Sequence, residues 1–385
     1  MQPILAYCRQ EQPELMQTWE SLVNIDSGSG YAPGLRQVGE LVGNFCAQQG
    51  MRVEFHPVGG GDSEFHVTAV KAGTGSKSIL LLAHMDTVFP EGTAAARPFR
   101  TDGEWAYGPG VSDCKGGVAL ALHAVKILQA MNSSDYRQLT CCFNCDEEIS
   151  SPHSRQLIQL LARQHDYVLS LEPGGVTDSV IAWRKGVAKL KLTVTGKSSH
   201  AGSDPDKGAN ALLELARQLP RLAALADSAQ QTTVTFTRAA AGDRLNVVPD
   251  YAEAWADVRA VSDAEFARVE REARQLAAAG ATAGTAAAVS LTVGRPPFAA
   301  NAGTAMLTAR AETIYAELGR RLSSSGAGGG SDANLAAAAG AVVLDSLGPV
   351  KGGPNHTADE KTRLESVVPR LYLLVRLISD LGSGR

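Results

Sequence analysis

The stretch Ser78–His84 constrains the fold more than any other part of the chain. Its apolar run ends abruptly at His84, and Asp86 follows two positions later. The run is short and comes after glycine and polar residues, which predicts a buried central strand rather than a helix. Side chains two positions apart point to the same side of a strand. We therefore expect His84 and Asp86 to emerge together at the strand's carboxyl end, where open α/β sheets bind ligands.

Two interpretations of this pair stay open at this point. A histidine that binds a metal usually donates its second ring nitrogen to a nearby carboxylate, and Asp86 has the spacing for that role. A hydrogen-bonded histidine at a strand end would show the same two residues. The rest of the chain has to distinguish these interpretations.

Two other predicted strands also end in acidic residues. Segment 139–144 leads to an Asp-Glu-Glu triplet at 146–148, and segment 167–171 leads to Glu172. Segments with helix-like apolar spacing separate the strands. This alternation predicts an α/β fold with a mixed, mostly parallel sheet, helices on both of its faces and a site along its carboxyl edge.

The pattern changes near Arg184. The order β-α-β-β-α-β then follows, which is typical of a small ferredoxin-like α+β sandwich. A chain of 385 residues is long enough for two domains. We expect a discontinuous catalytic domain of residues 1–184 and 295–385, and an inserted lid or dimerisation domain of residues 185–294.

The composition excludes several classes of partner. The net charge of −4 gives no reason to expect nucleic acid or an anionic membrane as partner. No segment approaches the roughly 20 apolar residues of a membrane span, and the start of the chain lacks the features of a secretory signal. A cytoplasmic protein is expected. One C-x-x-C, at Cys142–Cys145, without a second such pair makes a cysteine-bound structural zinc site improbable.

Two histidines and three carboxylates have the chemistry of a metal centre. They are His84, Asp113, Glu148, Glu172 and His356. This mixed set suits a borderline ion such as zinc. Three carboxylates and a bridging hydroxide would balance the charge of two zinc ions. Two ions roughly 3.5–4 Å apart would activate a water and polarise a substrate carbonyl.

Glu147 is the candidate general base. Two adjacent acids after a strand end must point in different directions, so Glu148 can bind metal while Glu147 takes a proton from water. A solvated acidic turn is the alternative. Asp113 has a similar alternative as the start of a helix, but Gly116 and Gly117 after it permit a close backbone approach that a helix cap does not require.

Other segments carry weaker signals. Apolar spacing predicts a helix over 11–23, and glycine predicts a loop over 323–331. His200 lies in a polar loop, where a lone histidine is usually solvated. His153 and His165 stand in polar surroundings and are expected at the surface.

Eight stretches together resemble the zinc metallopeptidase family that contains glutamate carboxypeptidases of the carboxypeptidase G type, aminoacylases and acetylornithine deacetylases. They occur in the family's order and span nearly the whole chain. They are Ala83-His-Met-Asp-Thr-Val, Gly110-Val-Ser-Asp-Cys-Lys-Gly-Gly, Asp146-Glu-Glu, Leu171-Glu-Pro-Gly, Ser199-His-Ala-Gly, Asn246-Val-Val-Pro, Asp257-Val-Arg259 and Asn355-His356. The chain departs from the family at Pro109 and Cys114, where arginine and methionine are common.

The resemblance implies two Zn²⁺ ions per chain, with Co²⁺ or Mn²⁺ as alternatives. One ion would be held by His84, Asp113 and Glu172. Asp113 would bridge to the second ion, which Glu148 and His356 would also hold.

The resemblance also implies roles around the metal. Asp86 would orient His84, and Glu147 would act as general base and then as proton donor to the leaving amine. In relatives the histidine that corresponds to His200 reaches the active site of the partner subunit and stabilises the oxyanion. We therefore expect a homodimer formed through the lid domain.

Three residues match substrate-binding positions of the family. Asn246 and Arg259 match positions that bind the substrate's terminal carboxylate, which an arginine fork can pair bidentately. Arg295 lies in a Gly-Arg-Pro segment that resembles the glutamate carboxypeptidase branch, and a second arginine would favour an acidic leaving residue.

The leading hypothesis is a dinuclear zinc hydrolase that cleaves an amide bond in a small N-acyl amino acid or short peptide and releases a C-terminal amino acid, glutamate. An aminoacylase or deacetylase acting on other N-acyl amino acids is the alternative. A non-catalytic binding relative is disfavoured, because Glu147 and all five metal-ligand candidates are present.

Overall fold

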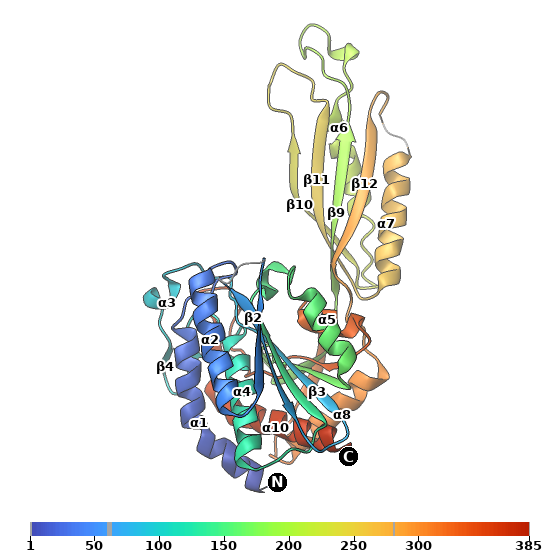
Figure 1. Ribbon diagram of the computed structural model, residues 1–385. Coiled ribbons are helices and arrows are strands. Elements are labelled where there is room, and N and C mark those ends of the chain that lie inside the picture. Colours follow the sequence, from blue (N-terminus) through green and yellow to red (C-terminus); the bar gives the residue numbers. More distant parts are fainter. Residues whose placement is uncertain (1, 60–63, 280–281, 385) are drawn as a thin grey trace. The chain divides into compact units, whose positions relative to one another are not determined.

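The computed structural model describes residues 2–59, 64–279 and 282–384. The chain divides into two compact units (Figure 1). The main unit comprises Met1–Trp183, Ala300–Gly326 and Ser331–Arg385. The inserted unit comprises Arg184–Ala299 and Ala327–Gly330.

A six-stranded sheet forms the centre of the main unit. In sheet order the strands are β1 (Arg52–Pro57), β2 (Phe65–Ala72), β6 (Gln138–Asn144), β3 (Ser78–His84), β7 (Tyr167–Ser170) and β14 (Val342–Leu344). The four strands β6, β3, β7 and β14 run parallel, whereas β2 runs antiparallel to both of its neighbours. All seven residues of β3 are buried, as its apolar run predicts.

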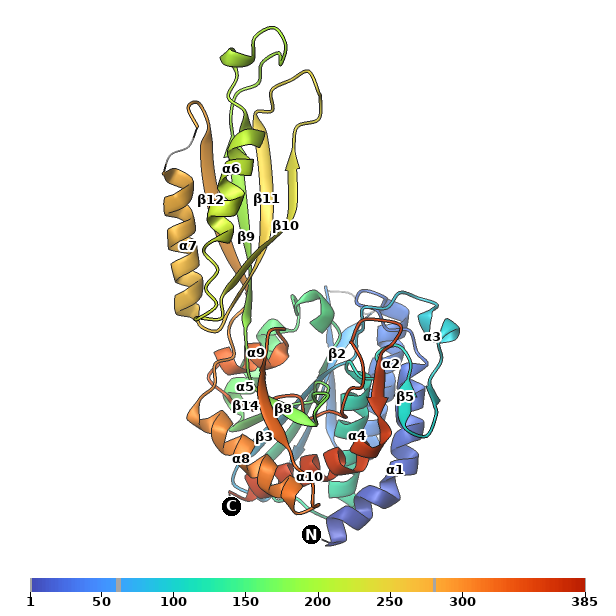
Figure 2. The ribbon, with the colours of Figure 1, turned by 180° about the vertical axis from the view of Figure 1, so that it is seen from behind.

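Helices cover both faces of this sheet (Figures 1 and 2). Helices α2, α4 and α10 pack on one face, with α1 and α8 against them, and α5 and α9 lie on the other face. Their bounds are α1 (Gln2–Val23), α2 (Ala32–Gln48), α4 (Lys115–Ala130), α5 (Arg155–Gln164), α8 (Ala302–Ala316), α9 (Asp332–Ala338) and α10 (Val367–Ser383). The predicted mixed, mostly parallel α/β architecture is confirmed.

Short elements complete the main unit, and two expectations about local structure are wrong. Helix α1 begins at Gln2 rather than at residue 11 and continues through Pro13. The glycine-rich segment after residue 323 begins as a strand that pairs with β8, not as a loop. The short elements are α3 (Thr93–Ala96), β4 (Arg100–Thr101), β5 (Trp105–Tyr107), β8 (Ser179–Arg184), β13 (Ser323–Ala327) and β15 (Lys361–Arg363).

The inserted unit has the predicted ferredoxin-like order. Its antiparallel sheet contains β10 (Thr233–Ala241), β11 (Tyr251–Ala260), β9 (Gly186–Thr195) and β12 (Ala286–Arg295), in that spatial order. Alternate residues of β9 from Ala188 to Val194 are buried. Helices α6 (Ala211–Ala223) and α7 (Asp263–Ala278) pack against the sheet.

None of the helices in the described part of the chain has both the length and the apolar character that crossing a membrane requires.

The expectation that His165 lies at the surface is wrong. The residue is only 6% exposed. Its Nδ1 lies 2.7 Å from the Leu161 carbonyl oxygen and its Nε2 lies 2.8 Å from Thr140 Oγ1. Burial lowers the pKa of His165 below its ordinary value. The folded protein therefore favours the neutral ring.

This lowered pKa predicts a loss of stability in weak acid. As the pH falls below about 6.5, the unfolded chain binds the proton before the folded chain does, so the free energy of unfolding decreases. One such group contributes at most about 1.4 kcal/mol per pH unit. We expect the melting temperature to fall between pH 7 and pH 5, and to fall less in His165→Gln. The exposed His153→Gln is the control at equal metal loading, and the same slope in both variants would contradict the prediction.

Candidate metal centre

Five side chains meet beyond the carboxyl ends of the central strands. β3 ends in His84, β6 leads to the 3₁₀ turn Glu147–Ile149, and β7 leads to Glu172. Asp113 lies just before α4, and the loop after β14 carries His356. The parallel arrangement of three neighbouring strands thus brings residues far apart in sequence to one edge of the sheet.

Gly117, four residues after Asp113, occupies a position with no room for a side chain. A Cβ atom at Gly117 would lie 2.0 Å from the Leu171 carbonyl oxygen. The start of α4 therefore packs directly on the end of β7, which carries Glu172. The neighbouring Cys114 thiol donates to the same carbonyl at 3.1 Å.

Two groups of possible ligands share Asp113. His84 Nε2 lies 3.0 Å from Asp113 Oδ1 and 3.9 Å from Glu172 Oε1. His356 Nε2 lies 3.2 Å from Asp113 Oδ2 and 3.1 Å from Glu148 Oε2. Within each group the ligand atoms all lie within 4.8 Å of one another. The Asp113 carboxylate thus faces one histidine with each oxygen, as a bridge between two metal ions would.

Asp86 contacts both His84 and the acidic turn. His84 Nδ1 lies 3.0 Å from the Asp86 backbone carbonyl oxygen and 3.4 Å from its carboxylate. The carboxylate accepts the backbone N–H groups of Glu147 at 3.1 Å and Glu148 at 3.0 Å, and the Ser29 hydroxyl at 2.6 Å. The backbone carbonyl of Asp86 is therefore the group of this residue nearest to the His84 ring. The carboxylate of Asp86 holds the turn that carries Glu147 and Glu148.

The charges around Asp113 fit a cationic occupant. Burial raises the pKa of Asp113, but hydrogen bonds from His356 and His84 outweigh it and hold this pKa well below its usual range. Hydrogen bonds to Asp113 and Glu148 raise the pKa of His356 to about 10. Positive charge is therefore favoured beside Asp113 and Glu148, and a metal ion that displaced a proton from His356 would supply it.

Glu148 provides a second test of fit. Its Oε1 is buried and has no hydrogen-bond partner among the described residues, and burial raises the pKa of this carboxyl. A buried carboxylate oxygen without a partner is costly unless a ligand satisfies it. Imidazole nitrogens and carboxylate oxygens together suit divalent transition metals. The residues present therefore fit a dinuclear site.

Two further residues, Glu360 and Asn355, contribute to the site. Glu360 is 1% exposed, and its Oε1 accepts the backbone N–H groups of Ser112 at 2.9 Å and Asp113 at 3.0 Å. Asn355 Nδ2 donates to Asp113 Oδ2 at 2.7 Å. Glu360 lies in a charged run of the sequence, and only its long-range contacts with Ser112 and Asp113 show its role. Asn355 belongs to the Asn355-His356 stretch that resembles the family, but the sequence predicted no role for it.

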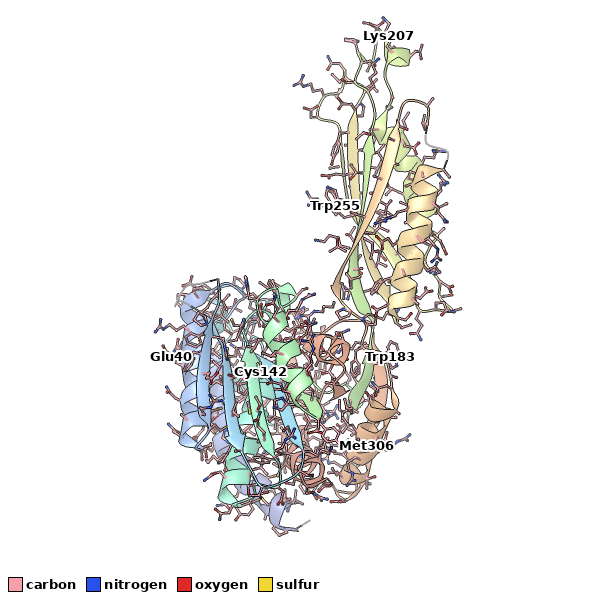
Figure 3. All side chains as sticks on the ribbon, turned by 45° about the vertical axis from the view of Figure 1, so that its right-hand side comes forward. Glu40, Cys142, Trp183, Lys207, Trp255 and Met306 are labelled. Carbon is pink, nitrogen blue, oxygen red and sulfur yellow. The ribbon has the colours of Figure 1, made fainter. Side chains whose placement is uncertain are left out.

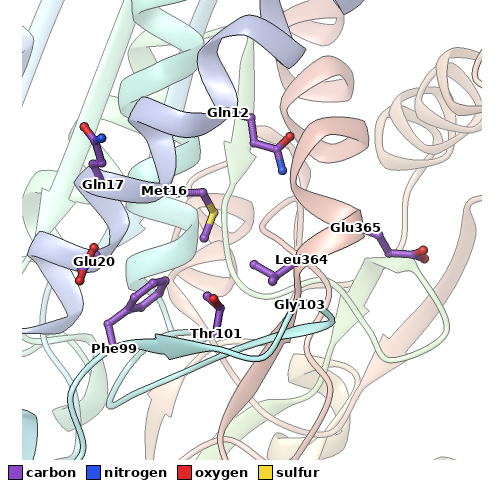
Figure 4. A pocket seen from close by; sticks show the side chains of 9 residues that line it. All are labelled: Gln12, Met16, Gln17, Glu20, Phe99, Thr101, Gly103, Leu364 and Glu365. Carbon is purple, nitrogen blue, oxygen red and sulfur yellow. The ribbon is translucent and has the colours of Figure 1, made fainter.

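A separate cavity of about 530 Å³ in the main unit contains none of these ligands (Figure 4). Four side chains of α1, among them Met16, line it together with Phe99 and Leu364. Its two carboxylates, Glu20 and Glu365, have no histidine beside them in the lining. Because this cavity lacks the proposed metal ligands, its volume alone is no reason to assign catalysis to it.

His200 lies in the connection between β9 and α6 of the inserted unit, and Asn246 lies in the connection between β10 and β11. Figure 3 labels Lys207, which belongs to the same connection as His200. The Ala201 N–H donates to the Asn246 carbonyl oxygen at 2.9 Å, and His200 pairs with Val247 as an isolated bridge. His200 Nδ1 accepts the N–H groups of Gly202 and Ser203 at 3.1 and 3.0 Å. The neutral ring then carries its proton on Nε2, as a donor at an exposed position.

Arg259 and Arg295 lie at the opposite end of the same sheet. Both pair in register with Val187, from β11 on one side and β12 on the other. Arg259 makes a two-point contact with Asp257, at 2.7 and 2.9 Å, so a substrate carboxylate would have to compete for it. Arg295 is only 4% exposed. Counted along β9 and its continuation, the arginine pair and His200 are roughly 40 Å apart.

Comparison with known proteins identifies a family that this chain matches. Residues 80–380 match the Peptidase family M20/M25/M40. Carboxypeptidase G2 from Pseudomonas sp. (strain RS-16) is 37% identical over 377 residues, which cover 97% of this chain and 91% of that protein. Acetylornithine deacetylase from Pasteurella multocida (strain Pm70) is 29% identical over 266 residues, 64% of this chain and 68% of that protein.

The fold has close counterparts among solved structures. Aminopeptidase PepT from Bacillus cereus ATCC 10987 superposes with a TM-score of 0.80 at 23% identity, covering 96% of this chain and 98% of that one. At this identity the likeness establishes the fold, and the choice of substrate has to come from the residues of the site.

Proposed function

Because this chain belongs to the peptidase family M20/M25/M40 and is a metallopeptidase, we propose that it is a carboxypeptidase that cleaves an amide bond to release a C-terminal glutamate. The observation that carries the proposal is the pair of ligand groups that share Asp113, with Glu147 on the adjoining turn. The 37% identity to carboxypeptidase G2 supports the choice of reaction and leaving residue.

We assign five residues to two zinc ions. His84 and Glu172 would hold one ion, Glu148 and His356 the other, and Asp113 both. When bound, the ions would supply activation of the attacking water and polarisation of the substrate carbonyl. Asp86, Glu360 and Asn355 would keep these ligands in place through the contacts described above.

Proton transfer falls to Glu147. As general base it would take a proton from the water that attacks the carbonyl carbon, and as general acid it would return a proton to the leaving amine. The amine then departs as a neutral group when the carbon–nitrogen bond breaks. The Nε2–H of His200 would donate to the carbonyl oxygen as that oxygen gains negative charge.

The distance between the two ends of the inserted unit's sheet supports a dimer. Asn246 and Arg259 are both candidates for the substrate's carboxylate, yet they lie at opposite ends of one sheet. One small substrate spans far less than roughly 40 Å, so it cannot contact both ends of the same sheet. If both ends serve catalysis, His200 and Asn246 would reach the site of a second copy.

Mixing two inactive variants tests this arrangement. Glu147→Gln lacks the base and His200→Ala lacks the oxyanion donor. In a mixed dimer, the His200→Ala chain keeps its base and would receive His200 from its partner. After unfolding and refolding of an equal mixture, we expect about a quarter of wild-type activity, from half of the dimers and one site in each. Activity no higher than that of the separate variants would contradict the arrangement.

A panel of leaving residues tests the preference for glutamate. We expect kcat/KM for N-acyl glutamate to exceed that for the leucine and ornithine counterparts by about tenfold or more. Arg295→Ala should abolish that preference, whereas Arg259→Ala should weaken all substrates alike, because each has a terminal carboxylate. Arg295→Lys controls for the loss of a buried side chain. Equal losses on all three substrates in Arg295→Ala would instead favour the aminoacylase or deacetylase alternative.

A further inference from the structure

The turn between β6 and α5 carries both proposed active-site glutamates in an uncommon backbone conformation. Ser150 and Ser151, just after Glu147 and Glu148, have φ values of 74° and 54°. Non-glycine residues rarely adopt this left-handed region, so surrounding contacts must hold the turn. Asp86 holds its beginning through two backbone N–H groups.

Asp332 holds the far side of this turn. Its Oδ1 accepts the Ser151 hydroxyl, and its Oδ2 accepts Asn144 Nδ2 at 2.6 Å. Ser151 and Asn144 are both fully buried, and Asp332 is 3% exposed. One carboxylate therefore joins the last residue of β6 to the residue that closes the turn.

Asp332 is itself fixed by helix α9. It is the first residue of α9, whose start Ser331 and Asn334 close with a capping box. Ser331 Oγ also donates to the buried Asp345 at 3.1 Å. Several contacts therefore hold the chain at Asp332, which lies 181 residues from Ser151 in the sequence. The reaction chemistry assigned above makes no use of Asp332.

We propose that Asp332 is a positioning residue for Glu147 and Glu148. By holding Ser151 and Asn144, its carboxylate keeps the turn in the conformation that aims one glutamate at the substrate and the other at the metal. The proposal rests on the proposed function for the role of Glu147, but the placement of Glu148 can be measured without turnover.

Three variants at two positions test it in the full chain. Asp332→Ala removes both acceptors, and we expect kcat to fall at least tenfold while KM changes less than threefold. Ser151→Ala should lower kcat in the same way by a smaller factor. Asp332→Asn should recover most of kcat, because its oxygen can accept from Asn144 and the Ser151 hydroxyl can rotate to accept from its amide.

Cobalt substitution gives a readout that does not depend on turnover. The visible absorption of the Co²⁺-loaded protein reports ligand geometry, and we expect its band shape to change in Asp332→Ala and to return in Asp332→Asn. Glu214→Gln is the matched control. Glu214 is fully buried in the inserted unit, where its side chain binds Arg217, Gln218 and Thr282. We expect Glu214→Gln to leave kcat and the cobalt spectrum unchanged.

The outcomes separate this inference from the proposed function. If Asp332→Ala and Ser151→Ala keep wild-type kcat and the wild-type cobalt spectrum, Asp332 does not position the turn. Losses of equal size in Glu214→Gln would also overturn the inference, since they would reflect stability alone. If the wild-type protein cleaves no N-acyl amino acid, the proposed function fails while the cobalt spectra still test Asp332. If Asp332→Ala does not fold, Ser151→Ala decides.

Discussion

Replacing Glu147 with glutamine is expected to lower kcat/KM for every N-acyl amino acid by about 10²- to 10⁴-fold, the range that general acid–base groups contribute. Glutamine has nearly the same size and can still accept a hydrogen bond, but it cannot take the proton from water. Metal content should stay at the wild-type level, because Glu147 belongs to neither ligand group.

The neighbouring acid provides the matched control. Glu148→Gln changes the same functional group one residue away, yet it should lower metal content as well as activity, since Glu148 Oε2 faces His356 Nε2 at 3.1 Å. Steady-state kinetics and elemental analysis of both variants separate the two roles. Unchanged hydrolysis in Glu147→Gln would refute the proposed mechanism, and loss of metal in that variant would make Glu147 a ligand instead.

Asp113→Ala is expected to lose both metal ions, whereas His356→Ala is expected to lose one. Asp113 belongs to both ligand groups and His356 to only one. Activity should fall roughly a thousandfold or more in both variants, because a two-metal site needs both ions for hydrolysis. The measurement is metal per chain after dialysis without chelator, with Asp113→Ala and His356→Ala compared with wild type.

An exposed acid outside the ligand groups controls for nonspecific loss. Asp359 is exposed and lies three residues from His356 in the sequence. The Asp359→Ala variant should keep both ions, because Asp359 belongs to neither ligand group. Equal metal content in Asp113→Ala and His356→Ala would show that Asp113 does not bridge. Full activity in metal-free wild-type protein would remove the metal centre from the mechanism altogether.

Much of the main unit could be predicted because strand periodicity and strand ends are local signals. The apolar run before His84 is a buried strand, and the acids after the next two strands lie at the same edge of the sheet. Parallel strands bring their carboxyl ends together, so residues separated by many positions could be assigned to one site before any contact was known.

The supporting contacts could not be predicted because they join distant, individually ordinary residues. Glu360 lies in a charged run of the sequence, and Asp332 directly follows the glycine-rich segment 323–331. Their roles come from burial against Ser112 and Ser151, which no local pattern encodes. The prediction that His165 lies at the surface is wrong for the same reason, since its polar neighbours in sequence are not its neighbours in space.

If Asp113 holds both ions, as proposed, the two ions would not load independently. An ion in one group would fix the orientation of the Asp113 carboxylate that the other group shares, and it would change the charge that the second ion meets. Such coupling is reciprocal, so each ion alters the affinity of the other by the same factor. A substitution confined to the His356 side should therefore shift the affinity of the ion held by His84, although no ligand of that ion has changed.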